Sequence, residues 1–204
     1  MAVIKLSTFC QMIGERHTMT GLFCDLLRRH FATERNIPVA DLRNLIWQKT
    51  DETGILVEPA YKWRPELTQH RPAVLIKPNA FVNKKIGLAN LRQLPFVDKT
   101  GNKRFLTYWL GSHTIFCIAG NGTKVELLAN EVRAELSQFC EVIRSALDLK
   151  QFGVIELGAI SILEEAQENL VVPVTVGYAI EERWMVREQA PRLNRISLTA
   201  FIQD

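Results

Sequence analysis

The sequence predicts an α+β protein in which a mostly antiparallel β-sheet is flanked by helices, one of them long, amphipathic and packed on the sheet. Apolar residues recur at helical spacing near the N-terminus and again after residue 124. Between these regions and after the second one, apolar residues follow the two-residue period of strands. The chain has 204 residues and 47% hydrophobic content, which is enough to bury one core. We therefore expect one domain overall, with a helical N-terminal segment at 1–50 and an α+β core at 51–204.

Two helices are predicted in the N-terminal segment. In "HTMTGLFCDLLRRHF" the apolar residues return every three or four positions from Met19 to Phe31, which makes one apolar stripe. "PVADLRNLIW" is predicted to be a second, short helix, because proline is favourable in the first turn and Pro38 opens the segment.

Strands are predicted from residue 54 onward. "GILVEPAYKW" alternates between two faces, with Tyr61 and Trp63 on the face expected to be buried. "RPAVLIKP" is a second strand, bounded by prolines. Residues 81–104 have no clean period, and we interpret them as a long basic excursion. "RFLTYWLGSHTIFCIAG" then forms one or two strands.

The most regular pattern in the chain is a run of apolar residues at helical spacing over more than five turns. It predicts a long amphipathic helix carrying Val125, Leu128, Val132, Leu136, Phe139, Ile143 and Leu147 on one face. The strands "FGVIELGAISIL" and "LVVPVTVGYAI" follow, joined by the turn "EEAQEN", and "NRISLTAFI" is a further candidate strand. One face of the second strand is expected to hold only small residues, namely Pro173, Thr175, Gly177 and Ala179.

The stretch "GNGTKVELLANEV" places a glycine turn between a strand and a helix, as in many phosphate-binding sites. Its spacing does not fit a Walker A loop, and Val125 stands where the dinucleotide fingerprint needs its third glycine. Thr123 followed by Glu126 instead forms the T-x-x-E pattern of a capping box. The turn is therefore predicted to cap a helix and to bind no nucleotide.

Pairs of neighbouring polar residues could suggest catalysis, but strand geometry argues against it. Ser112 and His113 point to opposite faces of a strand, so they cannot act together as nucleophile and base. The same divergence applies to the adjacent glutamates at 164–165 and 181–182. No catalytic residues are expected.

The cysteine and histidine spacing predicts no metal site. Cys10, Cys24, Cys117 and Cys140 form no C-x-x-C pair and are expected to be reduced, mostly buried thiols. His113 and Cys117 lie about 13 Å apart on one strand, too far to share a metal ion. No apolar run approaches the ~20 residues that span a bilayer, and the first 16 residues lack the apolar core of a signal peptide. We expect no cofactor, no metal and no membrane.

Charge is distributed unevenly along the chain. Ten Lys or Arg stand against three acidic residues between Glu58 and Arg104, a net charge of +7, and twelve acidic against five basic residues between Val125 and Glu188, a net charge of −7. The two regions are either solvated faces or the two sides of a head-to-tail contact between copies. The residues expected at such an interface are Lys84, Lys85, Lys103, Arg104, Glu164, Glu165, Glu168, Glu181 and Glu182.

Several segments in succession resemble a known family. They are "GILVEPAYKWRPE", "RPAVLIKP", the strand leading into "GNGTKVELLANEV", "FGVIELGAISILEE", "VVPVTVGYAIEERW" and "EQAPRL". This succession resembles structural proteins at the head–tail junction of tailed bacteriophages and is most similar to the tail terminator family. The resemblance covers roughly residues 50–195 and rests on pattern and element order.

The resemblance implies a non-enzymatic virion protein of the neck, made in the host cytoplasm. Copies would form a ring, typically of about six, that caps the tail tube and docks the head-completion (stopper) protein. Genomic DNA would pass through the channel without sequence-specific binding. Two alternatives stay open: another neck ring, such as the stopper or adaptor, and a small cytosolic enzyme that holds a phosphate ligand at the glycine turn.

Overall fold

A computed structural model describes residues 2–5, 16–50, 53–62, 64, 72–84, 96–97, 103–164 and 168–187. These residues form mixed α and β structure around one largely antiparallel sheet, which confirms the predicted class. The strands are β1 (Ala2–Lys5), β2 (Leu56–Pro59), β3 (Ala73–Pro78), β4 (Val82–Lys84), β5 (Phe96–Val97), β6 (Lys103–Ala119), β7 (Gln151–Leu157), β8 (Ser161–Ile162) and β9 (Leu170–Arg187). The C-terminal candidate strand "NRISLTAFI" and Cys10 lie outside the described residues.

The sheet follows the order β1-β9-β6-β3-β2. Strands β4 and β5 also pair with β6, and β7 and β8 also pair with β9. Among the strand pairs of the described residues, only β2 with β3 is parallel. The residues between these two strands, 60–72, are just long enough for the crossover that a parallel pair requires.

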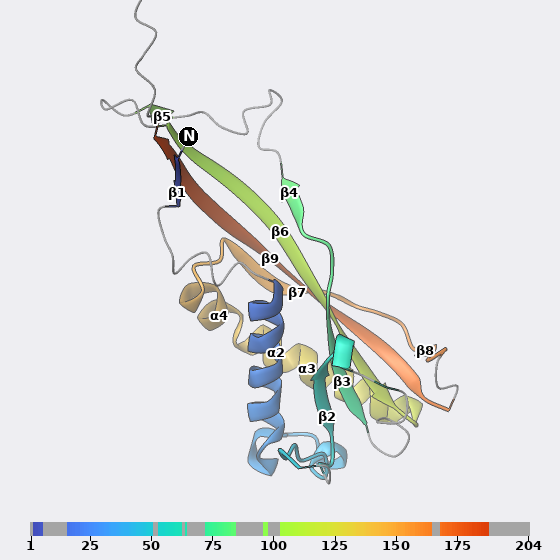
Figure 1. Ribbon diagram of the computed structural model, residues 1–204. Helices are drawn as coiled ribbons and strands as arrows, with labels where there is room; N and C mark the ends of the chain where they lie inside the picture. Colours follow the sequence, from blue (N-terminus) through green and yellow to red (C-terminus); the bar gives the residue numbers. More distant parts are fainter. Residues whose placement is uncertain are drawn as a thin grey trace, which may run out of the picture.

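The long strands β6 and β9 form the centre of the sheet, where most of the other strands pair with them. They pair continuously from Lys103 opposite Val186 to Ala119 opposite Leu170. At about 3.3 Å per residue, the 17 residues of β6 span about 56 Å. The helices gather around one half of this ribbon, and β1 and β5 lie at the other end (Figure 1).

The strands that pair with β6 and β9 show that two of the sequence-based expectations are wrong. The N-terminal segment is not wholly helical, because β1 pairs with the far end of β9. The basic excursion at 81–104 contributes β4 and β5 to the sheet, and its last residues, Lys103 and Arg104, belong to β6. Residues 85–95 and 98–102 lie outside the described residues.

The predicted N-terminal helix is present as α2 (Arg16–Phe31). Met19, Phe23, Leu27 and Phe31 are fully buried, as the stripe predicted. The second helix is reduced to a 3₁₀ turn, η2 (Ala40–Leu42), preceded by another, η1 (Glu34–Asn36).

The predicted long helix is interrupted. It consists of α3 (Gly122–Gln138) and α4 (Cys140–Ala146), with Phe139 between them at φ −93° and ψ 7°. The bend brings α4 against β7, where the Cys140 thiol donates a hydrogen bond to the Phe152 carbonyl at 3.0 Å. Phe139 therefore sits at the joint and is partly exposed, whereas the stripe of α3 is buried.

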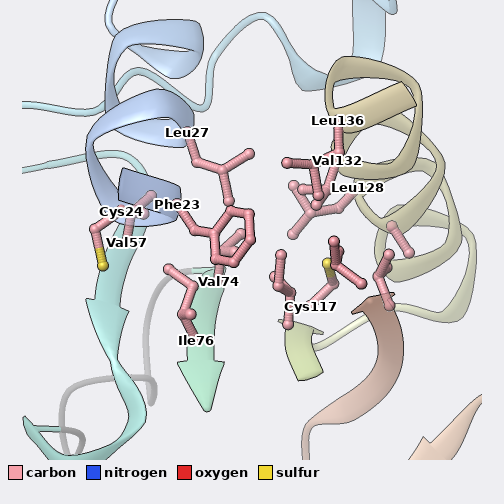
Figure 2. Close-up of a cluster of buried hydrophobic side chains, with 14 of the residues drawn as sticks. Phe23, Cys24, Leu27, Val57, Val74, Ile76, Cys117, Leu128, Val132 and Leu136 are labelled. Carbon is pink, nitrogen blue, oxygen red and sulfur yellow. The ribbon is translucent and has the colours of Figure 1, made fainter. Parts of the chain in front are cut away.

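Helices α2 and α3 cover the same face of the sheet. Figure 2 shows Phe23 and Leu27 of α2 facing Leu128, Val132 and Leu136 of α3 above the strands. A single buried cluster includes both helices and the inner residues of β2, β3, β6, β7 and β9. The inner face of β9 is the one predicted, with Val172, Val174, Val176, Tyr178 and Ile180 buried.

The first predicted strand is shorter than expected. The chain leaves β2 at Pro59 and turns into the 3₁₀ helix η3 (Ala60–Lys62). Proline has no N–H to donate to a further ladder bond. As a result Tyr61, expected on the buried face, has 73% of its surface exposed, and Trp63 lies outside the described residues.

The glycine turn caps α3, but through a different residue from the one predicted. The Asn121 side chain accepts a hydrogen bond from the Thr123 backbone N–H at 2.9 Å, so Asn121 is the N-cap. Thr123 is already inside the helix. Asparagine is as good a cap as threonine, and the helix consequently starts earlier than the T-x-x-E pattern suggested.

Candidate functional site

Large apolar side chains are exposed on one edge of the sheet. Strands β7 and β8 pair with β9 on the side away from β6, and no other strand of the described residues pairs with them. Ile155 has 68% and Ile162 has 62% of its surface exposed, and Leu157 and Ile160 are also exposed. Exposed apolar groups on an uncovered strand edge are typical of protein–protein contacts.

Acidic residues accompany these apolar side chains. Glu156 is exposed on β7, and Glu164 and Glu168 are exposed at the turn between β8 and β9. Glu165, in the same turn, lies outside the described residues. We call the following set the acidic edge: Ile155, Glu156, Leu157, Ile160, Ile162, Glu164 and Glu168.

Small residues on the outer face of β9 leave room for the Ile155 side chain. A register shift between Val154 and Glu156 changes the phase of β7. The Ile155 side chain then lies over Gly177, where a Cβ atom would have only 2.2 Å to its Cδ1. Gly158 packs against Pro173 in the same way and donates its N–H to the Pro173 carbonyl at 2.8 Å. At Gly177 and Pro173, the small-residue face of β9 is therefore packed against the chain's own β7 segment.

The opposite side of the sheet is basic. Val82 on β4 has 55% of its surface exposed, and Tyr61 is exposed on η3. Lys62, Arg64 and Lys77 are exposed near them in sequence or on the adjoining strand β3. We call the following set the basic edge: Tyr61, Lys62, Arg64, Lys77 and Val82. Lys84 is the last residue of β4, and Lys85 lies outside the described residues.

Two of the predicted interface glutamates have partners within the chain. Glu181 accepts a hydrogen bond from the Tyr108 hydroxyl at 2.9 Å and lies 3.6 Å from the Lys150 ammonium. Glu182 accepts from the Trp109 indole N–H at 2.9 Å. Both glutamates are partly buried. Their hydrogen bonds stabilise the pairing of β6 with β9. The sequence did not predict this role for the two glutamates.

Sequence reasoning also missed a buried polar contact between α2 and the sheet. His113 is fully buried, with Nε2 at 2.9 Å from the Thr20 hydroxyl and Nδ1 at 3.2 Å from the Tyr178 hydroxyl. The Phe23 ring packs edge-on against this imidazole. Thr20 is buried too, so this Thr–His–Tyr arrangement is closed to substrate and orients α2 on the sheet.

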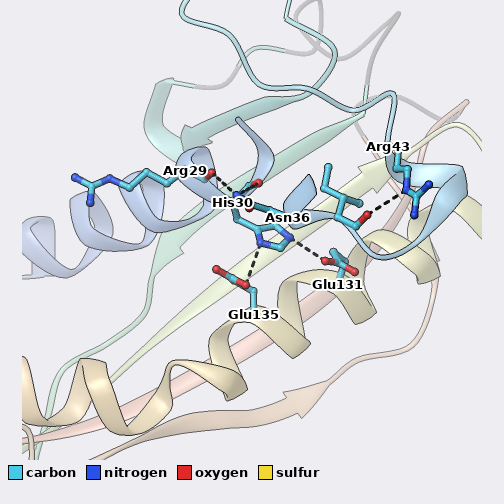
Figure 3. Close-up of polar contacts among 7 residues, drawn as sticks. Arg29, His30, Asn36, Arg43, Glu131 and Glu135 are labelled. Atoms are coloured by element: carbon cyan, nitrogen blue, oxygen red, sulfur yellow. Dashed lines mark hydrogen bonds and ion pairs between the residues drawn. The ribbon is translucent and has the colours of Figure 1, made fainter. Parts of the chain in front are cut away.

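A second buried cluster joins α2 to α3 (Figure 3). His30 Nε2 lies 2.8 Å from Glu131 Oε1, and His30 Nδ1 lies 3.0 Å from Glu135 Oε2. Burial raises the pKa of Glu135 above its ordinary value, with His30 opposing the rise and Glu131 adding to it. The sequence does carry a signal for this contact. Glu131 is a charged residue that stands between the apolar positions Leu128 and Val132.

Two of the described cysteines, Cys24 and Cys117, are buried. Burial raises the pKa of Cys24 to about 11, and burial also raises that of Cys117, so neither thiol is a nucleophile at neutral pH. At the glycine turn, the Thr123 N–H is bonded to Asn121 and cannot serve an anion. Within the described ranges, no group of three or more His, Cys, Asp or Glu residues is placed to hold a metal ion. The described helices are too short or too polar to cross a bilayer.

Neither a protein-family model nor a curated protein matches the chain.

Proposed function

We propose that the chain is a structural protein of the head–tail junction of a tailed bacteriophage. In this proposal, copies form a ring of about six subunits that caps the tail tube and joins it to the head-completion protein. The protein belongs to the virion neck, takes no cofactor, and lets genomic DNA pass without sequence-specific contacts. The proposal starts from the resemblance of the sequence to tail terminators.

The observation that carries the proposal is the pair of unlike edges on one sheet. A subunit of a closed ring needs two different surfaces that fit each other, because each copy contacts its two neighbours through different faces. The acidic edge and the basic edge are of this kind: both expose apolar side chains, and their charges are opposite. Exposed apolar area of this extent on a protein without a partner would favour aggregation.

The long ribbon of β6 and β9 adds a second feature suited to a neck protein. It extends beyond the helices and carries β1 and β5 at its end (Figure 1). A projection of this kind can contact a layer above or below the ring. It supports a role between two assemblies, such as the tail tube and the head-completion protein.

Depletion of the protein in the phage that encodes it tests the proposal. A cap on the tube stops its polymerisation, so its loss should give overlong tubes and unattached, DNA-filled heads in electron micrographs of the lysate. A stopper or adaptor would instead leave tubes of normal length when depleted. Infectious particles in normal yield after depletion would contradict any role in the neck.

A further inference from the structure

We infer that the acidic edge of one copy is covered by the basic edge of the next copy of the same chain. This contact deepens the proposed ring and rests on that proposal for its closure. Its occupant is a second copy of this chain, and the contact joins β7 and β8 of one subunit to η3, β3 and β4 of its neighbour.

The two edges cannot meet within one chain. They lie on opposite sides of the sheet, because β3 and β4 both pair with β6 and are three strand positions from β7 along the path β7-β9-β6. At about 4.8 Å between neighbouring strands, the separation is at least about 14 Å. Any contact between them is therefore between copies, and it is heterologous, which is the geometry that builds rings.

The two edges are complementary in charge. Three exposed carboxylates belong to the acidic edge, and three exposed cationic side chains belong to the basic edge. Like edges would place charges of one sign together, so a two-fold contact of acidic edge with acidic edge is disfavoured.

Both edges also provide apolar contact. Ile155 and Ile162 on one side, and Tyr61 and Val82 on the other, are among the most exposed large hydrophobic residues of the described chain. Charge complementarity alone would give a contact that salt abolishes. Apolar side chains at its centre and charges at its rim make the contact persist in physiological salt.

The test uses two variants, each blocked on one edge. Ile155→Glu with Ile162→Glu removes the apolar part of the acidic edge. Lys62→Glu with Lys77→Glu reverses charge on the basic edge. All four side chains are exposed, so the fold is retained, which circular dichroism and thermal melting check.

Sedimentation velocity over a concentration series measures association of the purified full-length chain. Wild type is expected to form oligomers at about 1 mM protein in both low and physiological salt, and each blocked variant to associate about tenfold or more weakly. When the two variants are mixed, one intact edge remains on each, and they should form a 1:1 pair that does not grow.

The control is Val142→Glu. Val142 lies on α4 and has 63% of its surface exposed, which matches Ile162 but lies off both edges. This variant should assemble like wild type.

Three results would overturn the contact: a wild type that stays monomeric throughout, a mixture that gives no 1:1 pair, or an equal loss of assembly in the Val142 control. None of them involves tail tubes. The neck proposal can therefore fail in the depletion experiment while the contact stands, and the contact can fail while depletion still gives overlong tubes.

Discussion

The cluster of His30, Glu131 and Glu135 should be a main determinant of how firmly α2 is held against α3. Both ring nitrogens of His30 face carboxylate oxygens at 2.8 and 3.0 Å, and all three side chains are buried or nearly so. His30→Leu keeps most of the volume and removes both contacts. The Glu131 carboxylate is then left buried without its ring partner, and removing one member of a buried pair costs about 3–5 kcal/mol.

The assay is urea unfolding at pH 7, followed by tryptophan fluorescence. His30→Leu should lower the free energy of unfolding by about 3–5 kcal/mol. A double variant, His30→Leu with Glu131→Met, should recover at least about 1 kcal/mol of that loss, because the orphaned carboxylate is gone. Arg144→Ala, which breaks the exposed pair of Arg144 with Glu141, is the control and should change stability by less than about 1 kcal/mol.

Two outcomes would refute this reasoning. One is a loss below about 1 kcal/mol in His30→Leu, which would mean that the buried contacts contribute no more than exposed ones. The other is a double variant less stable than His30→Leu alone, which would mean that Glu131 contributes through contacts other than His30.

Three further predictions concern single positions. Asn121→Ala should lower the free energy of unfolding by about 1 kcal/mol through the lost cap, while Thr123→Ala should change it by only a few tenths; equal losses in denaturant melts would contradict the assignment of the cap. Gly111→Ala should cost about 1–3 kcal/mol, since a Cβ there would come within 2.4 Å of an aromatic ring, and Gly153→Ala, which meets nothing within 4 Å, should be tolerated; the thermal midpoints decide. The folded-state pKa of Glu135 lies above its ordinary value of 4.5, so its stabilising contribution is present in acid and is lost as pH rises through the folded pKa. Wild type should therefore lose stability relative to Glu135→Gln as pH rises above the ordinary value of 4.5, and the opposite slope would reject the raised pKa.

Local patterns predicted the parts of the fold that depend on local interactions. The stripe of α2 and the inner face of β9 follow from the period of apolar residues, and the structure confirms them. The helix break at Phe139 was not visible, because the apolar spacing continues through it and only the contact of α4 with β7 requires the bend.

The remaining errors came from pairings between distant parts of the chain. No local pattern indicates that β1 pairs with β9, or that β2 lies parallel to β3. The partners of Glu181 and Glu182 are likewise 73 positions away. Without knowledge of these pairings, the two glutamates looked like free surface charges. The edges of the candidate site could not be located for the same reason, since an edge is defined only when the strand order is known.

The pairing of β6 with β9 also bears on how fast the chain can fold. Ala119 and Leu170 are 51 positions apart, and Lys103 and Val186 are 83 positions apart. Closing these loops has an entropic cost, and the chain must overcome this cost before the hydrogen bonds of the ladder stabilise it. Folding of such topologies is therefore slow. The pairs at the Ala119 end close the shorter loop, and α3, α4 and β7 lie within that loop. The β6–β9 ladder should therefore form first at the Ala119 end and extend toward Lys103. The far end, where β1 and β5 attach, is the last to close and the first to open. Hydrogen exchange should show amide protection declining along β6 from Ile115 toward Thr107.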